Sequence, residues 1–261
     1  RIEATLTISL TPHTLTKDHT MATDRMLVWS GISRIDNATP IIVLATYVPR
    51  IGTKSAGSKN AKTGEMIQTY ILNADSSPIE SITTGNDQSI CGTCPQRGKA
   101  SGGSGACYVN VGQGPTSTWK AHNRNGSVPF DVERFRGKKV RFGAYGDPAA
   151  VPFEVWKSIA DVAESVTGYT HQWRTADPRF SQICMASADS VSEALEAKHT
   201  HGYRNFIVRP AGSAKPSGAI VCPASAEAGK KITCSDCLMC GGTSSNQTRD
   251  ITIIAHGTSA R

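Results

Sequence analysis

Apolar residues recur along the chain in short runs, most of them bounded by Gly, Pro, Ser or Asp. Runs of this length that are rich in Val, Ile, Thr, Tyr and Phe indicate β-strands. The predicted strands cover residues 41–47, 66–75, 138–148, 168–173, 180–187, 203–210, 219–225 and 251–257.

Three intervening stretches have a helical pattern instead. Residues 152–166 carry their apolar side chains at a period of three to four residues. Residues 115–126 begin with Pro and end with Gly, and residues 190–202 open with Ser190 and place Glu193 three positions later, as in a capping box. The pattern therefore predicts a helix in each of these stretches.

Strands that alternate with helices of about 12 residues favour right-handed crossovers and a parallel sheet. The expected fold class is α/β, a partial or full (βα) barrel of parallel strands with a cysteine-rich metal knot near the C-terminus. We expect residues 1–29 to be a flexible or extraneous N-terminal extension. Residues 30–261 would then form one barrel-like domain with cysteine-rich insertions at 91–107 and 222–240.

Composition narrows the class of protein. The chain has 261 residues, of which 38% are hydrophobic, and no apolar run approaches the roughly 20 residues that a membrane span needs. The net charge of +7 permits nucleic acid as a partner, although the Lys and Arg residues are scattered and form no dense basic helix. A chain rich in cysteine with no export signal fits a reducing cytoplasm.

Cysteine spacing is the strongest chemical signal in the sequence. Seven of the eight cysteines fall in two tracts with the spacing of metal ligands. The first tract contains Cys91, Cys94 and Cys107, and the second contains Cys222, Cys234, Cys237 and Cys240. Disulfides are the weaker interpretation, because disulfide scaffolds are short chains without a core. Cys184 stands alone, which is typical of a small buried hydrophobe.

Two kinds of metal centre match these tracts. Cysteines at every third position with a remote Cys-Pro, here Cys222 followed by Pro223, are typical of a [4Fe-4S] cluster. Zinc is the alternative metal, since Cys91 and Cys94 could pair with Cys237 and Cys240 as two knuckles of a zinc ribbon. A site with only three cysteine ligands leaves one metal position open, as reactive sites do.

Four further residues are candidates for function because each one follows or ends a predicted strand. Asp147 lies in a Gly-Asp-Pro turn, His171 lies near the end of the strand at 168–173 and Arg174 follows it, and Arg209 lies at the end of the strand at 203–210. The carboxyl ends of parallel strands share one rim, so Cys91, Cys94, Asp147, His171 and Arg209 should surround one concavity. The second cysteine tract should form a separate knot. Asp147, His171 and Arg174 are the candidate catalytic residues, and Arg209 is a candidate anion ligand.

The first tract, the aromatic residue after it and the turn at 144–148 resemble the motifs of the radical-SAM superfamily. In that family a three-cysteine loop holds a [4Fe-4S] cluster that binds S-adenosylmethionine, and a Gly-Gly-Glu-Pro-like motif contacts the cofactor's amino group. The resemblance covers roughly residues 70–257. It implies a cluster on the first tract, an auxiliary cluster on the second, and an electron donor as a partner. The residues that it implies for the cofactor are Tyr108, Ala144, Tyr145, Gly146 and Asp147.

The order of the motifs is also similar to uncharacterised proteins of bacteriophages and plasmids, which would place the chain in a bacterial host cell. Two function classes follow. One is an iron–sulfur enzyme of radical-SAM-like architecture, dependent on S-adenosylmethionine or on related redox chemistry, with an unknown substrate. The other is a zinc-stabilised, phage-related protein without catalysis that binds nucleic acid or a host protein.

Overall fold

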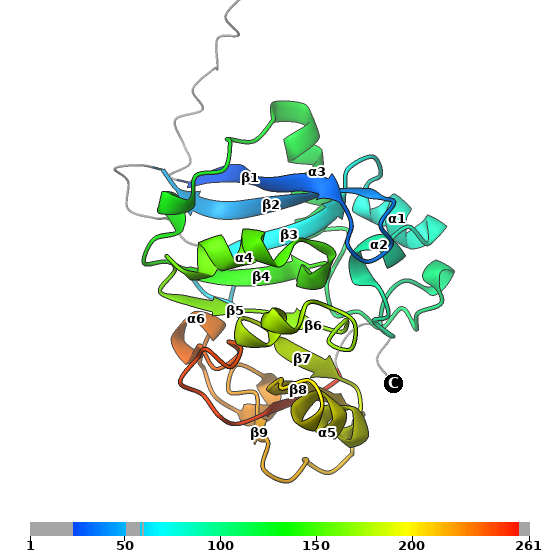
Figure 1. The fold of residues 1–261 in the computed structure, drawn as a ribbon, viewed down its shortest axis with the longest axis vertical. Coiled ribbons are helices and arrows are strands. Elements are labelled where there is room, and N and C mark those ends of the chain that lie inside the picture. The colour runs from blue at the N-terminus through cyan, green and yellow to red at the C-terminus, as the bar shows by residue number, and fades with distance from the viewer. Residues whose placement is uncertain (1–22, 51–57, 59, 256–261) are drawn as a thin grey trace, which may run out of the picture.

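A computed structural model describes residues 23–50, 58 and 60–255 of the chain (Figure 1). The first of its two sheets has the strand order β1-β2-β3-β4-β5. The strands are β1 (Thr23–Ile32), β2 (Pro40–Pro49), β3 (Ile67–Asn73), β4 (Lys139–Tyr145) and β5 (Ser165–Thr167). β1, β2 and β3 pair antiparallel, whereas β4 runs parallel to both β3 and β5.

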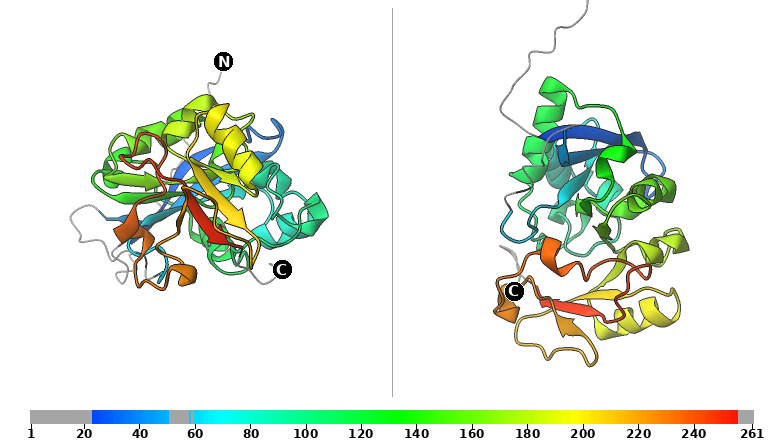
Figure 2. Two further views of the ribbon diagram at one scale, coloured as in Figure 1. Left: turned by 90° about the horizontal axis from the view of Figure 1, so that it is seen from below. Right: turned by 90° about the vertical axis from the view of Figure 1, so that its left-hand side faces the viewer.

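The second sheet is parallel throughout and has the order β6-β7-β8-β10-β9. Its strands are β6 (Tyr169–Thr170), β7 (Met185–Ala188), β8 (Asn205–Arg209), β9 (Ile220–Val221) and β10 (Ile251–Ile254). Only Gly168 separates β5 from β6, so one short segment of chain belongs to both sheets at their junction. In the right-hand view of Figure 2 the first sheet lies in the upper half of the molecule and the second sheet in the lower half.

The expected α/β class with parallel strands is therefore confirmed. The full barrel is not confirmed. β1 and β9 lie at the outer ends of the two sheets, and no pairing among the described strands joins them. The extension predicted over residues 1–29 is also corrected in part. Residues 23–29 belong to β1, whose Met26 and Val28 are buried, and residues 1–22 lie outside the described part of the chain.

Six α-helices accompany the described strands: α1 (Pro78–Thr84), α2 (Gln88–Cys91), α3 (Gly114–Asn125), α4 (Phe153–Ala160), α5 (Val191–His199) and α6 (Cys234–Cys237). The three predicted helices correspond to α3, α4 and α5. α4 ends six residues earlier than predicted, because residues 165–167 pair with β4 as β5. At the start of α5 the Ser190 hydroxyl accepts from the Glu193 N–H at 3.1 Å, while the Glu193 carboxylate accepts from the N–H of Asp189 at 2.8 Å.

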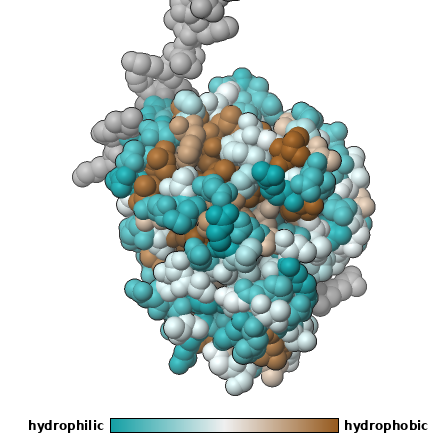
Figure 3. All heavy atoms as spheres, in the orientation of Figure 1, coloured by the Kyte–Doolittle hydropathy of each residue, from teal (hydrophilic) through white to brown (hydrophobic). Residues whose placement is uncertain are grey.

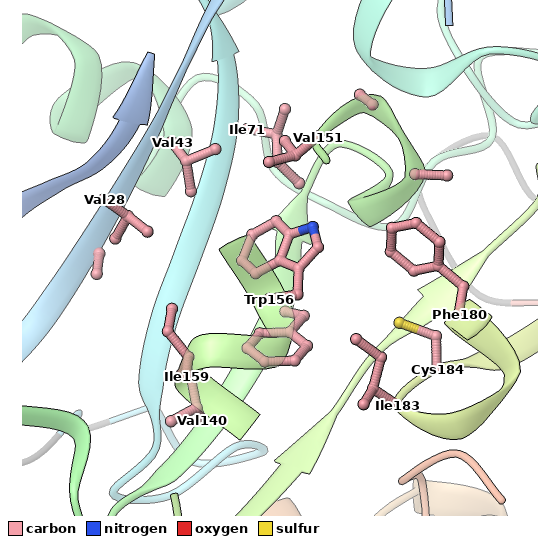
Figure 4. Packing of buried hydrophobic residues seen from close by; sticks show 14 of the residues in the cluster. Val28, Val43, Ile71, Val140, Val151, Trp156, Ile159, Phe180, Ile183 and Cys184 are labelled. Atoms are coloured by element: carbon pink, nitrogen blue, oxygen red, sulfur yellow. The ribbon is translucent and has the colours of Figure 1, made fainter. Parts of the chain in front are cut away.

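The main core lies between the first sheet and α4. Trp156 is fully buried, its ring centroid lies 4.7 Å from that of Phe142, and its indole N–H donates to the Pro148 carbonyl at 2.8 Å. Cys184 is 0% exposed and packs beside Phe180 and Ile183 at the junction of the sheets (Figure 4), which confirms its prediction as a buried hydrophobe. This core holds β4 and the β5–β6 junction in place.

Polar and apolar residues are mixed on the face shown in Figure 3, with apolar side chains gathered over the half that contains the first sheet. Among the helices of the described residues, none combines the length and apolar character that crossing a membrane requires.

Candidate metal centre

A cavity of about 170 Å³ lies where the two sheets meet. The end of β4 contributes Ala144, Tyr145 and Gly146, and the second sheet contributes Tyr169, Phe206 and Ile253 among other side chains. The end of β4 and side chains along β6, β8 and β10 thus face a common space.

All seven cysteines of the two tracts line this cavity. They are Cys91, Cys94, Cys107, Cys222, Cys234, Cys237 and Cys240. Every one of them is a free thiol. The expectation of a separate knot is therefore corrected, because the second tract shares its cavity with the first. Within the cavity the thiols still interact as two sets, a first set of three and a second set of four that follow the two tracts.

The first tract is folded back on itself by backbone hydrogen bonds. Cys94 N–H donates to the Cys91 carbonyl at 3.1 Å, and Cys107 N–H donates to the Gln96 carbonyl at 2.9 Å. The Asp87 carboxylate accepts from the N–H of Gly98 at 2.8 Å and anchors the loop to the start of α2. The twelve-residue gap before Cys107 is therefore a closed loop that returns the third thiol to the first two.

The second tract is fixed by two distant parts of the chain. Cys222 N–H donates to the Thr252 carbonyl of β10 at 2.8 Å, and Cys234 N–H donates to the Lys62 carbonyl at 2.8 Å. α6 is opened by a capping box between Thr233 and Asp236. Cys240 follows this helix and its carbonyl accepts from Gly168 N–H at 3.3 Å, so the tract reaches the junction of the two sheets.

Burial disfavours the thiolate form in both sets. It raises the pKa of Cys91 well above the ordinary value, and it also raises the pKa of Cys107, Cys222 and Cys234. The pKa of Cys240 rises to about 12, because burial and the neighbouring thiols outweigh the hydrogen bond with Tyr169. Without a bound metal ion these five groups are neutral thiols at pH 7.

Among the residues that the structure describes, no group of three or more His, Cys, Asp or Glu side chains is arranged so that it could hold a metal ion as it stands. Binding of a metal would therefore require the thiol side chains within each set to turn toward a common point.

His171 lies on the cavity beside the first set. Its Nε2 lies 3.2 Å from the Asp189 carboxylate, and its ring also hydrogen-bonds the Cys94 thiol. Burial lowers the pKa of His171, but the bonds to Asp189 and Cys94 outweigh burial and raise it to about 10. Gln96 donates to the other oxygen of Asp189 at 3.1 Å, which fixes the carboxylate. His171 is therefore an imidazolium held against a thiol.

Asp147 lines the cavity, as predicted, but its carboxylate is used by the chain itself. Its Oδ1 accepts from Ala149 N–H at 2.9 Å and its Oδ2 accepts from His171 N–H at 2.8 Å. Its own N–H donates to the Ile90 carbonyl at 2.7 Å. Burial raises its pKa. Asp147 thus joins β4, α2 and the His171 segment, which makes it a positioning residue.

Two predicted site residues do not line the cavity. Arg174 is on the surface, where it stacks on Trp173 at 3.8 Å and pairs with Glu193 and Glu196 of α5. Arg209 is buried in an ion pair with Glu227 and donates to the Ser213 carbonyl at 2.7 Å. Both cations are neutralised by carboxylates that lie far along the chain, which spacing alone could not reveal.

Three residues of the site were not predicted. Lys62 and Arg141 line the cavity as cations, and Asp189 orients His171. Tyr108, by contrast, lies where predicted, and its hydroxyl accepts a hydrogen bond from Arg141. Arg141 lies within a predicted strand, so the one available signal was a charged residue in an otherwise apolar run.

Comparison of the chain with protein-family models, with curated proteins and with solved structures yields no match. The similarity to the radical-SAM superfamily accordingly rests on the residues of the two cysteine tracts and of the turn at 144–148 alone.

Proposed function

We propose that the cavity is an iron–sulfur centre and that the protein is a redox enzyme of radical-SAM-like, partial-barrel architecture. The observation that carries the proposal is the convergence of seven thiols from two distant tracts on one cavity. Three thiols of the first set would hold a cluster with an open iron, and four thiols of the second set would hold an auxiliary cluster.

The donor set fits such a centre. Thiolates are the ligands of iron–sulfur clusters, and all seven thiols are free. A thiolate-bound cluster brings negative charge into a buried site, and the cavity supplies cations in Lys62, Arg141 and His171. Metal loading would release the protons of these neutral, buried thiols, because a bound cation stabilises the thiolate form.

An iron–sulfur cluster supplies one-electron chemistry when bound. The chain's own residues would fix the site and control its charge. His171 holds a proton beside Cys94, Asp189 orients the imidazole, and Asp147 holds the backbone of His171 in place. A narrower form of the proposal adds S-adenosylmethionine beside the first set, near Tyr108 and residues 144–146. In this form the Asp147 carboxylate, whose two oxygens accept from Ala149 and His171, would contact the cofactor through its remaining acceptor sites.

Anaerobic purification followed by iron and acid-labile sulfide analysis tests the proposal. We expect iron and sulfide in equal amounts, with Cys107→Ser losing the first cluster and Cys237→Ser losing the second. Cys184→Ser is the matched control, because its thiol lies in the core and outside the cavity. Stoichiometric zinc without sulfide would exclude the cluster and favour a zinc-stabilised binding protein. An absorbance change on adding S-adenosylmethionine tests the narrower form.

One observation favours a second candidate function. Cys94, His171 and Asp189 form a chain of hydrogen bonds in which a sulfur nucleophile contacts an imidazolium that a carboxylate orients. This arrangement would suit attack of the Cys94 sulfur, paired as a thiolate with the imidazolium, on a carbonyl carbon, with His171 donating its proton to the leaving group. Rapid alkylation of Cys94 by iodoacetamide in protein that binds neither iron nor zinc would favour this function, whereas protection of Cys94 by bound metal would favour the iron–sulfur centre.

A further inference from the structure

Arg141 places a buried positive charge in the cavity between the two thiol sets. Its residue is 7% exposed, and its guanidinium donates to the Tyr108 hydroxyl, next to Cys107 of the first set. On the other side it lies near the sulfur of Cys234 in the second set, which lines the same cavity. The side chain therefore lies between the surroundings of the two sets.

The hydrogen-bonding capacity of Arg141 is not used up within the described chain. Its Nε is buried and has no acceptor among the described residues. The largest electrostatic interactions of its charge involve Tyr108, Tyr169 and Cys234, none of which is a carboxylate. A buried cation without an anionic partner is costly, because desolvation is not offset by a nearby opposite charge.

The rest of the cavity offers Arg141 no anion either. Among the described residues that line it, Asp147 is the only carboxylate, and its two oxygens accept from Ala149 and His171. Arg209 provides the contrast, since this second buried arginine is paired with Glu227. The cavity thus has an excess of positive charge at a point where the chain supplies no counter-ion.

Apolar side chains flank this charge. Val109, Phe206, Val208 and Ile253 line the cavity and come from the first-tract loop, β8 and β10. A ligand that fits both features has an anionic group for the guanidinium and an apolar body for these walls.

We infer that the cavity binds a small organic anion, a carboxylate or a phosphate ester with an apolar body, whose anionic group contacts Arg141 between the two thiol sets. The inference names the substrate class of the proposed redox enzyme and rests on that function only for the reaction, since binding of the anion needs no cluster. A guanidinium binds both kinds of anion through paired N–H groups, which an amine cannot imitate.

Calorimetric titration with hexanoate and with hexyl phosphate tests the inference, and the tighter probe identifies the anionic group. We expect wild-type protein to bind at least one probe, and Arg141→Gln to bind it at least tenfold more weakly. Arg174→Gln is the control, because it removes one exposed arginine outside the cavity and should leave the affinity unchanged. Failure of both probes to bind wild-type protein, or equal affinity for wild type and Arg141→Gln, would overturn the inference.

Two further arms keep the result interpretable. Circular dichroism reports whether Arg141→Gln folds, and if it does not, Arg141→Lys decides: weaker binding supports the guanidinium contact, and equal affinity contradicts it. Titration of protein with measured iron and sulfide contents separates the two proposals. Arg141-dependent binding in protein that never takes up iron supports the anion site and contradicts the iron–sulfur centre. Iron-loaded protein without Arg141-dependent binding supports the iron–sulfur centre and contradicts the anion site.

Discussion

The imidazole of His171 lies 3.2 Å from the Asp189 carboxylate, although the two residues belong to different loops of the second sheet. The same ring contacts the Cys94 thiol, so a carboxylate, an imidazole and a thiol from three segments of the chain form one hydrogen-bonded series. This series joins the first cysteine tract to the second sheet, and it makes the charge of His171 a measurable property of the fold.

Replacement of Asp189 by Asn should lower the pKa of His171 from its value of about 10. The hydrogen bond to Asp189 is the largest of the interactions that raise this pKa. The pKa is raised above the unfolded value of 6.5, so protonated His171 contributes stability that is fully present below about pH 6.5 and is lost as the pH rises through 10. Asp189→Asn should therefore destabilise metal-free protein at pH 6, and the difference from wild type should shrink above pH 10.

Urea unfolding of both proteins across this pH range, with the His171 pKa followed by NMR, checks this expectation. Asp177→Asn is the control, since Asp177 pairs on the surface with Arg179 and should show no such dependence in the alkaline range. A stability difference that stays constant from pH 6 to pH 11 would contradict the role given to His171.

Asp147→Ala should reduce the free energy of unfolding by at least about 1–3 kcal/mol, because it leaves the backbone N–H groups of Ala149 and His171 without their acceptors. The measurement is urea unfolding at pH 7. Asp161→Ala removes an exposed carboxylate that pairs with Lys157 and should change stability by no more than about 0.5 kcal/mol. Equal effects of the two substitutions would show that Asp147 does not hold the site together.

Cys184→Ser should destabilise the protein by about 1–3 kcal/mol, because it places a hydroxyl among apolar side chains in a fully buried position. Its metal content should stay at the wild-type level, since Cys184 does not line the cavity. Thermal unfolding and metal analysis of the same preparation check both parts. A loss of metal without a loss of stability would mean that Cys184 is a ligand.

Gly168→Ala should disturb the junction of the two sheets. A methyl group there would lie 2.8 Å from the Cys184 sulfur and 3.2 Å from Cβ of Phe142, which is too close for the packed core. Overpacking of this kind costs about 1–3 kcal/mol. Gly112→Ala is the matched control, because the added methyl group meets only the Asn110 side chain at 3.6 Å. A melting temperature unchanged by Gly168→Ala would show that the junction is not tightly packed.

Local pattern was sufficient to predict β2, β3, β4 and β8 and the helices α3, α4 and α5, because alternation and helical periodicity follow from the geometry of each element alone. β1 was missed although Met26 and Val28 alternate with more exposed residues. β6 and β9 are shorter than their predicted strands. These differences arise because strand length depends on the neighbouring strand that supplies the hydrogen bonds, and that neighbour is distant in sequence.

For the candidate site, the chain by itself indicated candidate residues: seven cysteines at ligand spacing, and Asp147 and His171 near the ends of strands. Only the tertiary structure decided that both cysteine tracts share one cavity, that Asp147 serves the backbone, and that Arg209 and Arg174 are paired elsewhere. The reason is physical. Spacing along the sequence determines only which nearby side chains can contact one another. The charge and the hydrogen bonds of each group depend on its burial and on contacts with residues that are distant in sequence.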